Sequence, residues 1–188
     1  DLDGDGVPSI VVGVRSWQYL AYSPQLEIEW SNVIYAHSAT VAEVADLDGD
    51  GRREIVLGTD GGDVLVFDLN GKQLWQRNVG DRVASLVPMN LQAGTAIVAA
   101  SESGYVWAFD GSGKPRWHTN LGEPVRRLIP QADTLIGAAS AAGVVVLSQS
   151  GTVTAAATTP APATDVVVQG DQCAAQLADG SVCGIALK

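Results

Sequence analysis

The sequence has few of the residues that build reactive centres. Its 188 residues include two histidines, two cysteines and one methionine, and aromatic residues make up only 6%. The two histidines, His37 and His118, occupy unrelated positions of the sequence repeat described below. No nucleophile elbow, P-loop or dinucleotide-binding fingerprint occurs. We therefore expect no catalytic residues in this chain and no enzymatic activity from it.

Positive charge and long apolar runs are scarce as well. Lysine and arginine number 11 against 21 aspartates and glutamates, so the formal net charge is −10. An acidic surface repels nucleic acid and anionic membranes, and we expect neither as a partner. No apolar run approaches about 18 residues, the length that a membrane-spanning helix needs, so no membrane insertion is expected.

Two short segments carry much of the negative charge. They are DLDGDGVPSI at residues 1–10 and DLDGDGRREI at 46–55, and each leads into an apolar, β-branched run. Their aspartates stand at the first, third and fifth positions, as Asp1, Asp3, Asp5, Asp46, Asp48 and Asp50. The glycine that follows, Gly6 or Gly51, allows the chain to curl so that three carboxylates converge on one point.

Converging carboxylates repel one another unless a cation lies between them. A hard cation that prefers oxygen ligands fits this arrangement, and calcium is the best candidate. The alternative is that both segments are plain Asp-Gly turns whose side chains only cap the backbone. Two copies with the same spacing, each leading into a predicted strand, favour the metal site.

The chain repeats itself with a period of about 40 residues. The two aspartate segments start 45 positions apart. The segment VLVFDLNGKQLW at 64–75 returns 42 positions later as VWAFDGSGKPRW at 106–117. A fainter copy, VVVLSQSGTVTAA at 144–156, has Ala155 where the earlier copies have tryptophan. Such a repeat indicates a supersecondary unit that recurs along the chain.

Each unit is predicted to contain four short strands joined by tight turns. In the second unit, the expected strands are Val41–Ala45, Glu54–Thr59, Val64–Asp68 and Gln73–Arg77. The connections are too short for crossover helices, and no helical periodicity occurs. The predicted fold is therefore an all-β propeller with blades of four short antiparallel strands. A parallel β-helix is the main rival, but its coils are shorter and lack such hairpin turns.

One propeller domain of five units follows from the repeat, at about residues 1–40, 41–82, 83–124, 125–164 and 165–188. The first unit lacks its first strand and is predicted to have Ile10–Val14, Trp17–Tyr22 and Leu26–Trp30. The last lacks its fourth and is predicted to have Asp165–Val168, Cys173–Leu177 and Ser181–Leu187. This makes about three complete blades and two partial ones. Because incomplete blades expose sheet edges, we expect a fragment of a larger propeller, with self-association through unpaired blade edges as the alternative.

The aspartate segments resemble the calcium-binding loops of FG-GAP propeller repeats, found in integrin α-subunits and many secreted bacterial proteins. The family pattern is D-x-D-x-D-G-x-x-D, with ligands at the first, third, fifth, seventh (backbone carbonyl) and ninth positions. In the second segment the resemblance implies the ligands Asp46, Asp48, Asp50, the carbonyl of Arg52, and Glu54. In the first it implies Asp1, Asp3, Asp5, the carbonyl of Val7, and Ser9. Both segments depart from the pattern at the ninth position, where Glu54 keeps the charge and Ser9 loses it.

The segments FDLNGKQLW and FDGSGKPRW resemble the tryptophan-docking repeats of quinoprotein-like (PQQ-like) propellers. In such repeats an aspartate, a glycine and a tryptophan hold the outer strand against the neighbouring blade. The matching residues are Asp68, Gly71 and Trp75, then Asp110, Gly113 and Trp117. Together the two resemblances cover nearly the whole chain, and they specify the fold more than they specify a function.

Two functions from different classes remain. The first is a non-catalytic, calcium-binding module that scaffolds or recognises a protein or glycan in a secreted, cell-surface or periplasmic protein. The second is part of a propeller enzyme, either a quinoprotein dehydrogenase or a calcium-dependent polysaccharide lyase. The carboxylates lie in loops inside each repeat, which suits a structural role, so we expect the module, with calcium as its cofactor and no bound quinone.

Two pairs of residues fall outside the repeat pattern. Trp17 and Trp107 are predicted in strands of the central hairpins, where ordinary packing is expected. Cys173 and Cys183 flank the last hairpin. If its turn centres on the Asp-Gly pair, Cys183 lies opposite Gln176 and points away from the face that carries Cys173. A disulfide is therefore not expected without a change of register.

Overall fold

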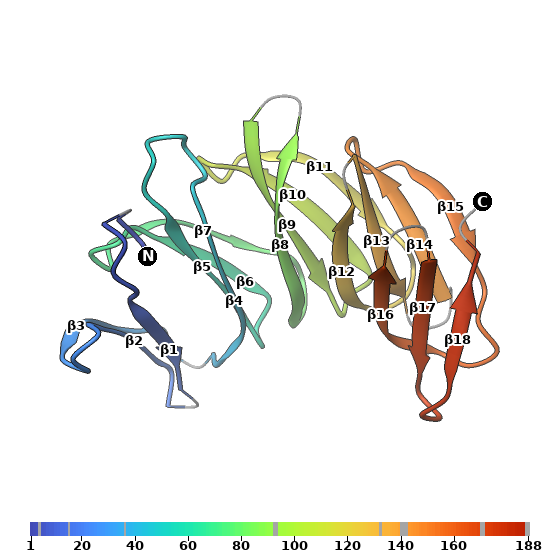
Figure 1. The fold of residues 1–188 in the computed structure, drawn as a ribbon, viewed down its shortest axis with the longest axis horizontal. Coiled ribbons are helices and arrows are strands. Elements are labelled where there is room, and N and C mark those ends of the chain that lie inside the picture. The colour runs from blue at the N-terminus through green and yellow to red at the C-terminus, as the bar shows by residue number, and fades with distance from the viewer. Residues whose placement is uncertain are drawn as a thin grey trace.

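The computed structural model describes residues 1–3, 5–14, 16–35, 37–91, 94–131, 133–139, 143–169 and 172–186. These residues form eighteen strands in five antiparallel sheets, and none of them is helical. The described part of the chain accordingly has no helix long and apolar enough to cross a membrane. The sheets follow one another along an arc, and the two termini lie toward its opposite ends (Figure 1).

Strands follow the sequence order within every sheet. The first sheet contains β1 (Ile10–Gly13), β2 (Gln18–Tyr22) and β3 (Ile28–Val33). The second contains β4 (Ala39–Ala45), β5 (Glu54–Thr59), β6 (Asp63–Phe67) and β7 (Gln73–Asn78). The third contains β8 (Val83–Leu91), β9 (Gly94–Ser101), β10 (Tyr105–Asp110) and β11 (Pro115–Asn120).

The last two sheets continue the pattern. The fourth contains β12 (Val125–Gln131), β13 (Thr134–Ala139), β14 (Gly143–Ser148) and β15 (Val153–Ala157). The fifth contains β16 (Ala163–Gln169), β17 (Gln172–Leu177) and β18 (Val182–Ile185). The prediction of three sheets of four strands between two sheets of three is confirmed. The end of the last predicted strand, at Leu187, lies outside the described residues.

The first strands of successive sheets contact one another: β4 with β8, β8 with β12, and β12 with β16. Hairpin turns join the strands of each sheet in order, from the innermost strand to the outermost. The strands β7, β11 and β15 therefore lie farthest from these contacts. Among the described residues the first sheet has no such inner strand, so β1, which pairs with β2, forms one edge of it.

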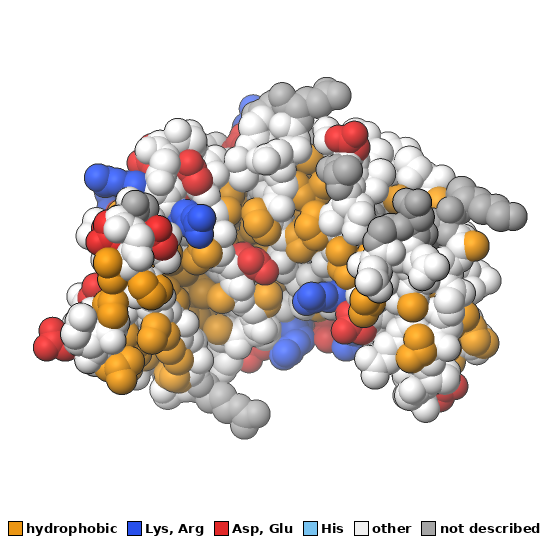
Figure 2. All heavy atoms as spheres, viewed as in Figure 1, with side chains coloured by type: hydrophobic (Ala, Val, Ile, Leu, Met, Phe, Trp, Pro, Cys, Tyr) orange, Lys and Arg blue, Asp and Glu red, His pale blue; other side chains and the backbone are white. Residues whose placement is uncertain are grey.

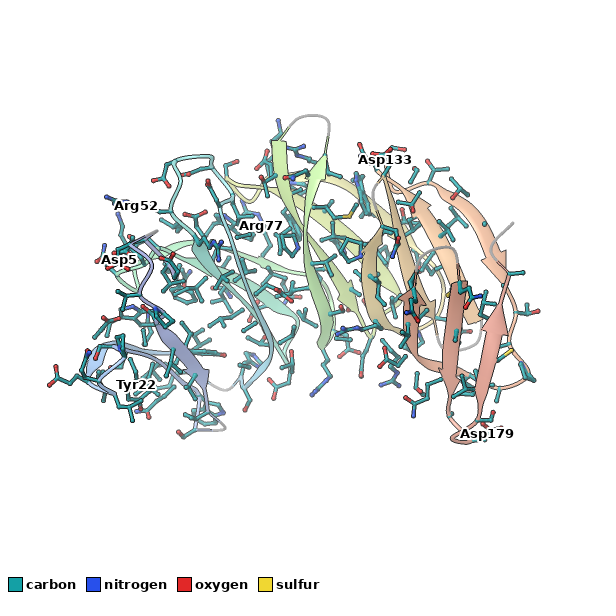
Figure 3. All side chains as sticks on the ribbon, viewed as in Figure 1. Asp5, Tyr22, Arg52, Arg77, Asp133 and Asp179 are labelled. Atoms are coloured by element: carbon teal, nitrogen blue, oxygen red, sulfur yellow. The ribbon has the colours of Figure 1, made fainter. Side chains whose placement is uncertain are left out.

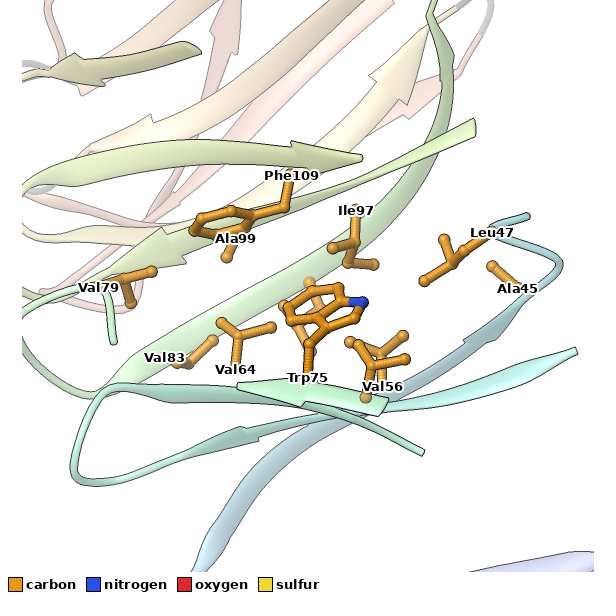
Figure 4. Packing of buried hydrophobic residues seen from close by; sticks show 12 residues of the cluster. Ala45, Leu47, Val56, Val64, Trp75, Val79, Val83, Ile97, Ala99 and Phe109 are labelled. Carbon is orange, nitrogen blue, oxygen red and sulfur yellow. The ribbon is translucent and has the colours of Figure 1, made fainter. Parts of the chain in front are cut away.

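The hydrophobic core is divided into four clusters, each between two consecutive sheets. In the cluster between the second and third sheets, Val56, Val64 and Trp75 pack against Ile97 and Phe109 (Figure 4). A sheet in the middle of the arc therefore buries both faces, which explains why every residue of β5 and β6 is buried.

A tryptophan on the last strand of each of the first three sheets docks on the next sheet. The indole N–H groups of Trp30, Trp75 and Trp117 donate hydrogen bonds to the backbone carbonyls of Leu69, Gly111 and Gln149, at 2.9, 2.8 and 2.8 Å. Each ring also lies on a glycine of the same turn, here called the docking glycine: Gly71, Gly113 and Gly151. The structural role expected of Trp75 and Trp117, packing between blades, is confirmed, and Trp30 has the same role.

An acidic side chain shapes the turn that carries the docking glycine. In the third sheet, Asp110 Oδ1 accepts hydrogen bonds from the backbone N–H groups of Ser112 and Lys114, both at 3.0 Å. Asp68 does the same in the second sheet. The turn brings Gly113 to a φ of 77°, a left-handed conformation that glycine adopts without a steric penalty.

Two residues of the first sheet, Trp17 and Leu26, lie in turns, so their predicted placement in strands is wrong. Their φ angles are 65° and 63°, values that no strand residue adopts. The prediction followed the strand preference of aromatic and apolar residues. The repeat overrides this preference, because the two residues stand 45 positions before Gly62 and Gly71, which occupy the corresponding turns.

The last hairpin also differs from expectation. Cys183 lies opposite Ala175, not Gln176, because the turn between β17 and β18 holds three residues instead of two. Cys173 and Cys183 therefore share a face, and both belong to the core between the fourth and fifth sheets. The predicted opposite orientation is wrong, and both thiols are free.

Trp107 lies on β10, as predicted, and is packed among other rings. Its indole stacks on Phe109 with a centroid distance of 5.8 Å and on His118 with one of 4.4 Å. Its Nε1 is buried and has no hydrogen-bond partner among the described residues. This tryptophan thus contributes contact area within the third sheet, without a docking hydrogen bond like that of Trp75.

Candidate metal centre

The two aspartate segments form loops at the same edge of the first two sheets. The second loop joins β4 to β5, and the first loop leads into β1. The backbone N–H of Arg53 donates a 2.8 Å hydrogen bond to the carbonyl of Leu2, so the loops lie side by side. Figure 3 shows Asp5 and Arg52, one from each loop, at this edge.

Three carboxylates converge in each loop, as the spacing predicted. Ligand oxygens of Asp1, Asp3 and Asp5 lie within 4.8 Å of one another, and the same holds for Asp46, Asp48 and Asp50. Such a set of negatively charged oxygens fits a hard cation, and calcium binds through this type of ligand. Without a cation the carboxylates repel one another at this separation.

Backbone N–H groups hold the carboxylates in place. Asp48 Oδ1 accepts a hydrogen bond from the N–H of Asp50 at 3.1 Å, and Asp50 Oδ1 accepts one from Arg52 at 2.7 Å. Asp3 and Asp5 repeat both bonds in the first loop, at 3.2 and 2.7 Å. These hydrogen bonds are those of ordinary aspartate turns, so they are compatible with the metal site and with the plain-turn alternative.

The second loop is more buried than the first. Asp46 Oδ1 accepts a hydrogen bond from Gly49 N–H at 2.6 Å, and its Oδ2 accepts one from Gly51 N–H at 3.0 Å. Asp46 is partly buried, whereas all three aspartates of the first loop are exposed. The second loop is therefore the better shielded from water of the two candidate sites.

Glu54 lies at the base of the second loop. It is 7% exposed, and its Oε2 accepts a 2.8 Å hydrogen bond from the N–H of Leu47. Burial raises the pKa of Glu54; the Leu47 N–H opposes this shift, and the negative charges of the three loop aspartates add to it. Glu54 is not among the residues whose oxygens converge within 4.8 Å. Its role as a ligand stays a prediction, as do those of Ser9 and the carbonyls of Arg52 and Val7.

Two leucines that were not singled out from the sequence anchor the loops. Leu2 and Leu47 occupy the second position of each aspartate segment and are 7% and 5% exposed. Each belongs to a core cluster between sheets. The carbonyl of Leu47 lies against Gly111 of the third sheet, where any Cβ would collide with it. The signal was present in the sequence, as an apolar residue between two aspartates in both copies.

Known proteins share this architecture. A family model described as outer membrane protein assembly factor BamB matches residues 9–150 and 60–188. The chain belongs to this family. Its repeats are therefore PQQ-like propeller repeats, as the tryptophan-docking segments indicated. No curated protein sequence matches the chain.

Solved structures share the fold at low sequence identity. BamB from Moraxella catarrhalis is 16% identical, with a TM-score of 0.72 over 96% of this BamB-family chain and 56% of that chain. Sqt1 from Saccharomyces cerevisiae is 13% identical, with a TM-score of 0.81 over 98% and 56%. BBS1N, solved in complex with ARL6DN, is 15% identical, with a TM-score of 0.73 over 98% and 64%. These likenesses show the propeller fold alone, and the chain spans 56–64% of the length of these three proteins.

Proposed function

We propose that this BamB-family chain is a non-catalytic, calcium-binding propeller module that binds a partner protein or glycan. The observation that carries the proposal is the pair of adjacent loops in which three carboxylates converge within 4.8 Å. Asp46, Asp48 and Asp50 would hold calcium in the second loop, with Glu54 and the carbonyl of Arg52 completing the set. The ion would offset the repulsion between the carboxylates and stiffen the edge of the first two sheets.

The interaction role is supported by the proteins that resemble this chain. The family is described as an outer membrane protein assembly factor. One structural neighbour was solved as BBS1N in complex with ARL6DN, and another belongs to the mitotic checkpoint complex. A propeller that presents loops from a rigid set of sheets suits protein or glycan recognition. We place the module in the cell envelope or outside the cell, in line with the family description and with the weak calcium affinity, about 0.1 mM, that is typical of extracellular modules.

Calcium binding is tested by thermal unfolding of the purified chain. With a dissociation constant of about 0.1 mM, about 2 mM calcium stabilises the fold by about 1.8 kcal/mol. Chelator should therefore lower the melting temperature, and calcium should restore it. Magnesium should restore little, because it demands a tighter octahedron and keeps its water. No response to calcium would return both loops to the plain-turn alternative.

The non-catalytic assignment is tested separately. The second candidate is part of a quinoprotein dehydrogenase or of a calcium-dependent polysaccharide lyase. The purified chain, supplied with calcium and quinone, should reduce no dye in the presence of alcohols or sugars, and it should cleave no acidic polysaccharide. Turnover in either assay would replace the module with the corresponding enzyme.

A further inference from the structure

The space beside the docking tryptophan differs from one junction between sheets to the next. Between the second and third sheets, Leu47 of the second aspartate loop belongs to the same core cluster as Trp75, and its carbonyl lies against Gly111. Trp75 is consequently only 8% exposed. Between the third and fourth sheets, Trp117 packs against the core but is only partly buried. The residue that covers Trp75 therefore has no counterpart over Trp117.

A shorter connection accounts for the difference. Where the second sheet has the aspartate loop between β4 and β5, the third sheet has a tight hairpin between β8 and β9, in which Leu91 pairs with Gly94. A hollow of about 640 Å³ lies beside Trp117, and we call it the junction hollow. Its lining includes Leu91, Arg116 and Trp117 of the third sheet and Asp133, Gln149 and Ser150 of the fourth.

The junction hollow has the size and the position of a small-molecule site. Such sites have volumes of about 300–1,000 Å³. The third sheet also packs on the second, and the fourth on the fifth, so the hollow lies inside the arc and not at either of its ends. Figure 3 shows Asp133, one of its lining residues, at the turn between β12 and β13. The hollow is therefore a property of this junction.

Two of the lining residues depart from the repeat. Gln149 stands where the third sheet has Gly111, 38 positions earlier, and Arg116 stands where the second sheet has Leu74, 42 positions earlier. A side chain in place of Gly111 would collide with the carbonyl of Leu47. Gln149 meets no such loop, and its side-chain amide donates a 3.0 Å hydrogen bond to Asp133 Oδ1. Two departures that line one space indicate a use specific to this junction.

The junction hollow offers hydrogen-bonding groups of every kind. The guanidinium of Arg116 only donates, the carboxylate of Asp133 only accepts, and the amide of Gln149 does both. The hydroxyl groups of Ser148 and Ser150 also do both, and they lie 2.9 Å apart. One positive and one negative side chain line the hollow, so their charges offset each other.

The corresponding hollow at the first junction has a different character. It lies beside Trp30, has a volume of about 600 Å³, and has two charged lining residues, Asp3 and Glu29, which are both acidic. Figure 2 shows acidic and basic side chains interspersed with uncharged ones over the described residues of the face it draws. The balance of charge in the junction hollow is thus set by its own lining residues.

We propose that the junction hollow binds a short neutral oligosaccharide. A sugar ring carries hydroxyl groups that donate and accept hydrogen bonds, together with an apolar face of C–H groups. The mixed donors and acceptors of the lining complement the hydroxyl groups, and the indole of Trp117 with the side chain of Leu91 complements the apolar face. A ligand with a net charge would be repelled by Arg116 or by Asp133.

A peptide fits the junction hollow less well than a sugar. An extended peptide is bound by pairing its backbone with a strand edge. The fourth sheet instead lines the hollow with residues of its turns and with Ser148, the last residue of β14. The inference rests on the interaction role proposed above and deepens it, because it names a ligand class and a place. It requires no calcium.

Nuclear magnetic resonance titration of the full chain, labelled with ¹⁵N and kept in chelator, tests the proposal. The probes are cellotriose, maltotriose and triacetylchitotriose, each added to about 20 mM. The indole N–H of Trp117 donates to the carbonyl of Gln149, so a sugar in the junction hollow should shift its signal. The indole N–H of Trp75 donates to Gly111 beneath the aspartate loop, and its signal should stay in place.

Substitutions in the lining should weaken binding at least tenfold. Arg116→Leu introduces the residue that the second sheet has at this position, and Asp133→Ala removes the carboxylate from the other sheet. Arg77→Leu and Asp179→Ala are the matched controls, because both side chains are exposed and neither lines the hollow. Melting temperatures measured in parallel separate a loss of binding from a loss of folding.

A shift of the Trp117 signal that both lining variants lose and both controls keep supports the proposal. No shift with any of the three probes overturns it, and so does a shift that Arg116→Leu and Asp133→Ala leave unchanged. Tighter binding of trigalacturonate or of deacetylated chitotriose would overturn the assignment of a neutral ligand. Sugar binding seen by calorimetry without a shift at Trp117 would preserve the interaction role and overturn this site alone.

Discussion

The indole ring of Trp75 lies on Gly113 of the next sheet so closely that a Cβ at that glycine would come within 2.7 Å of it. The same indole donates its N–H to the carbonyl of Gly111, two residues earlier in the chain. One tryptophan therefore both fills the space above the turn and satisfies one of its carbonyls. The turn, in return, can accept only glycine at this position.

Gly113→Ala should lower the free energy of unfolding by about 3 kcal/mol. About half of this is the cost of a side chain at positive φ, and the rest is the collision with Trp75. Gly180→Ala is the matched control, because Gly180 has a φ of 85° and no atom of the described residues lies within 4 Å of the place that a Cβ would take. It should cost about 1–2 kcal/mol, from the backbone alone. Chemical denaturation measures both values, and equal losses would show that the ring can move away.

The two aspartate loops should differ in their response to calcium. Asp48→Ala should remove most of the calcium-dependent rise in melting temperature, and Asp3→Ala should remove little. The second loop is more buried, since Asp46 is partly buried whereas the first loop's aspartates are exposed, and it has Glu54 where the first loop has Ser9. Fewer charges and greater exposure to water both weaken calcium binding. Calorimetric titration of the two variants measures the difference, and equal effects would contradict this ranking.

Alkaline unfolding should depend on Tyr19. Burial, with the negative charges of Asp60 and Asp63, raises the pKa of Tyr19 from 10.0 to about 12. The unfolded chain ionises this phenol at lower pH than the folded chain does. The stability that the neutral phenol contributes is therefore fully present below pH 10 and is lost as the pH rises toward 12. Tyr19→Phe should flatten the fall of the unfolding free energy across this window, as measured by denaturation at several pH values.

A substitution elsewhere serves as the control for that experiment. Tyr35 is 80% exposed, and Tyr35→Phe should leave the alkaline slope as it is in the unmodified chain. The same slope in Tyr19→Phe and in the unmodified chain would mean that another group governs alkaline unfolding.

The two free thiols should react at different rates. Cys173 is 5% exposed, and burial raises the pKa of its thiol, so little of the reactive thiolate is available. Cys183 lies on β18 and is only partly buried. A thiol reagent should label Cys183 first, and in Cys183→Ala the remaining thiol should react slowly. Mass spectrometry after brief labelling measures this, and faster labelling of Cys173 would mean that β18 opens readily.

The fold could be predicted from the sequence because each repeat unit carries recognisable residues in the same turns. The aspartate loops and the tryptophan segments recur at nearly constant spacing, and each occupies one fixed place in a blade. The convergence of Asp46, Asp48 and Asp50 follows from the same spacing, since alternate residues of a tight loop point to one side. These features are local, so a single sequence is enough to find them.

Other features depend on positions at which one unit departs from the rest. Trp17 and Leu26 have the composition of strand residues, and only alignment with Gly62 and Gly71 reveals that they stand in turns. The register of Cys183 depends on whether a turn holds two or three residues, which an Asp-Gly pair does not decide. The position of Glu54 beneath the loop depends on the hydrogen bond from Leu47, which the spacing alone does not specify.

The division of the core into four separate clusters has a consequence for how the molecule opens. Each cluster joins two consecutive sheets, so stability is a sum of neighbouring junctions rather than the property of one centre. Within this chain, the first and fifth sheets are each held by one junction, and the three between them by two. Amide hydrogen exchange should therefore be fastest in the two outer sheets and slowest in β9 and β10 of the third, so that the molecule frays from its ends toward its middle.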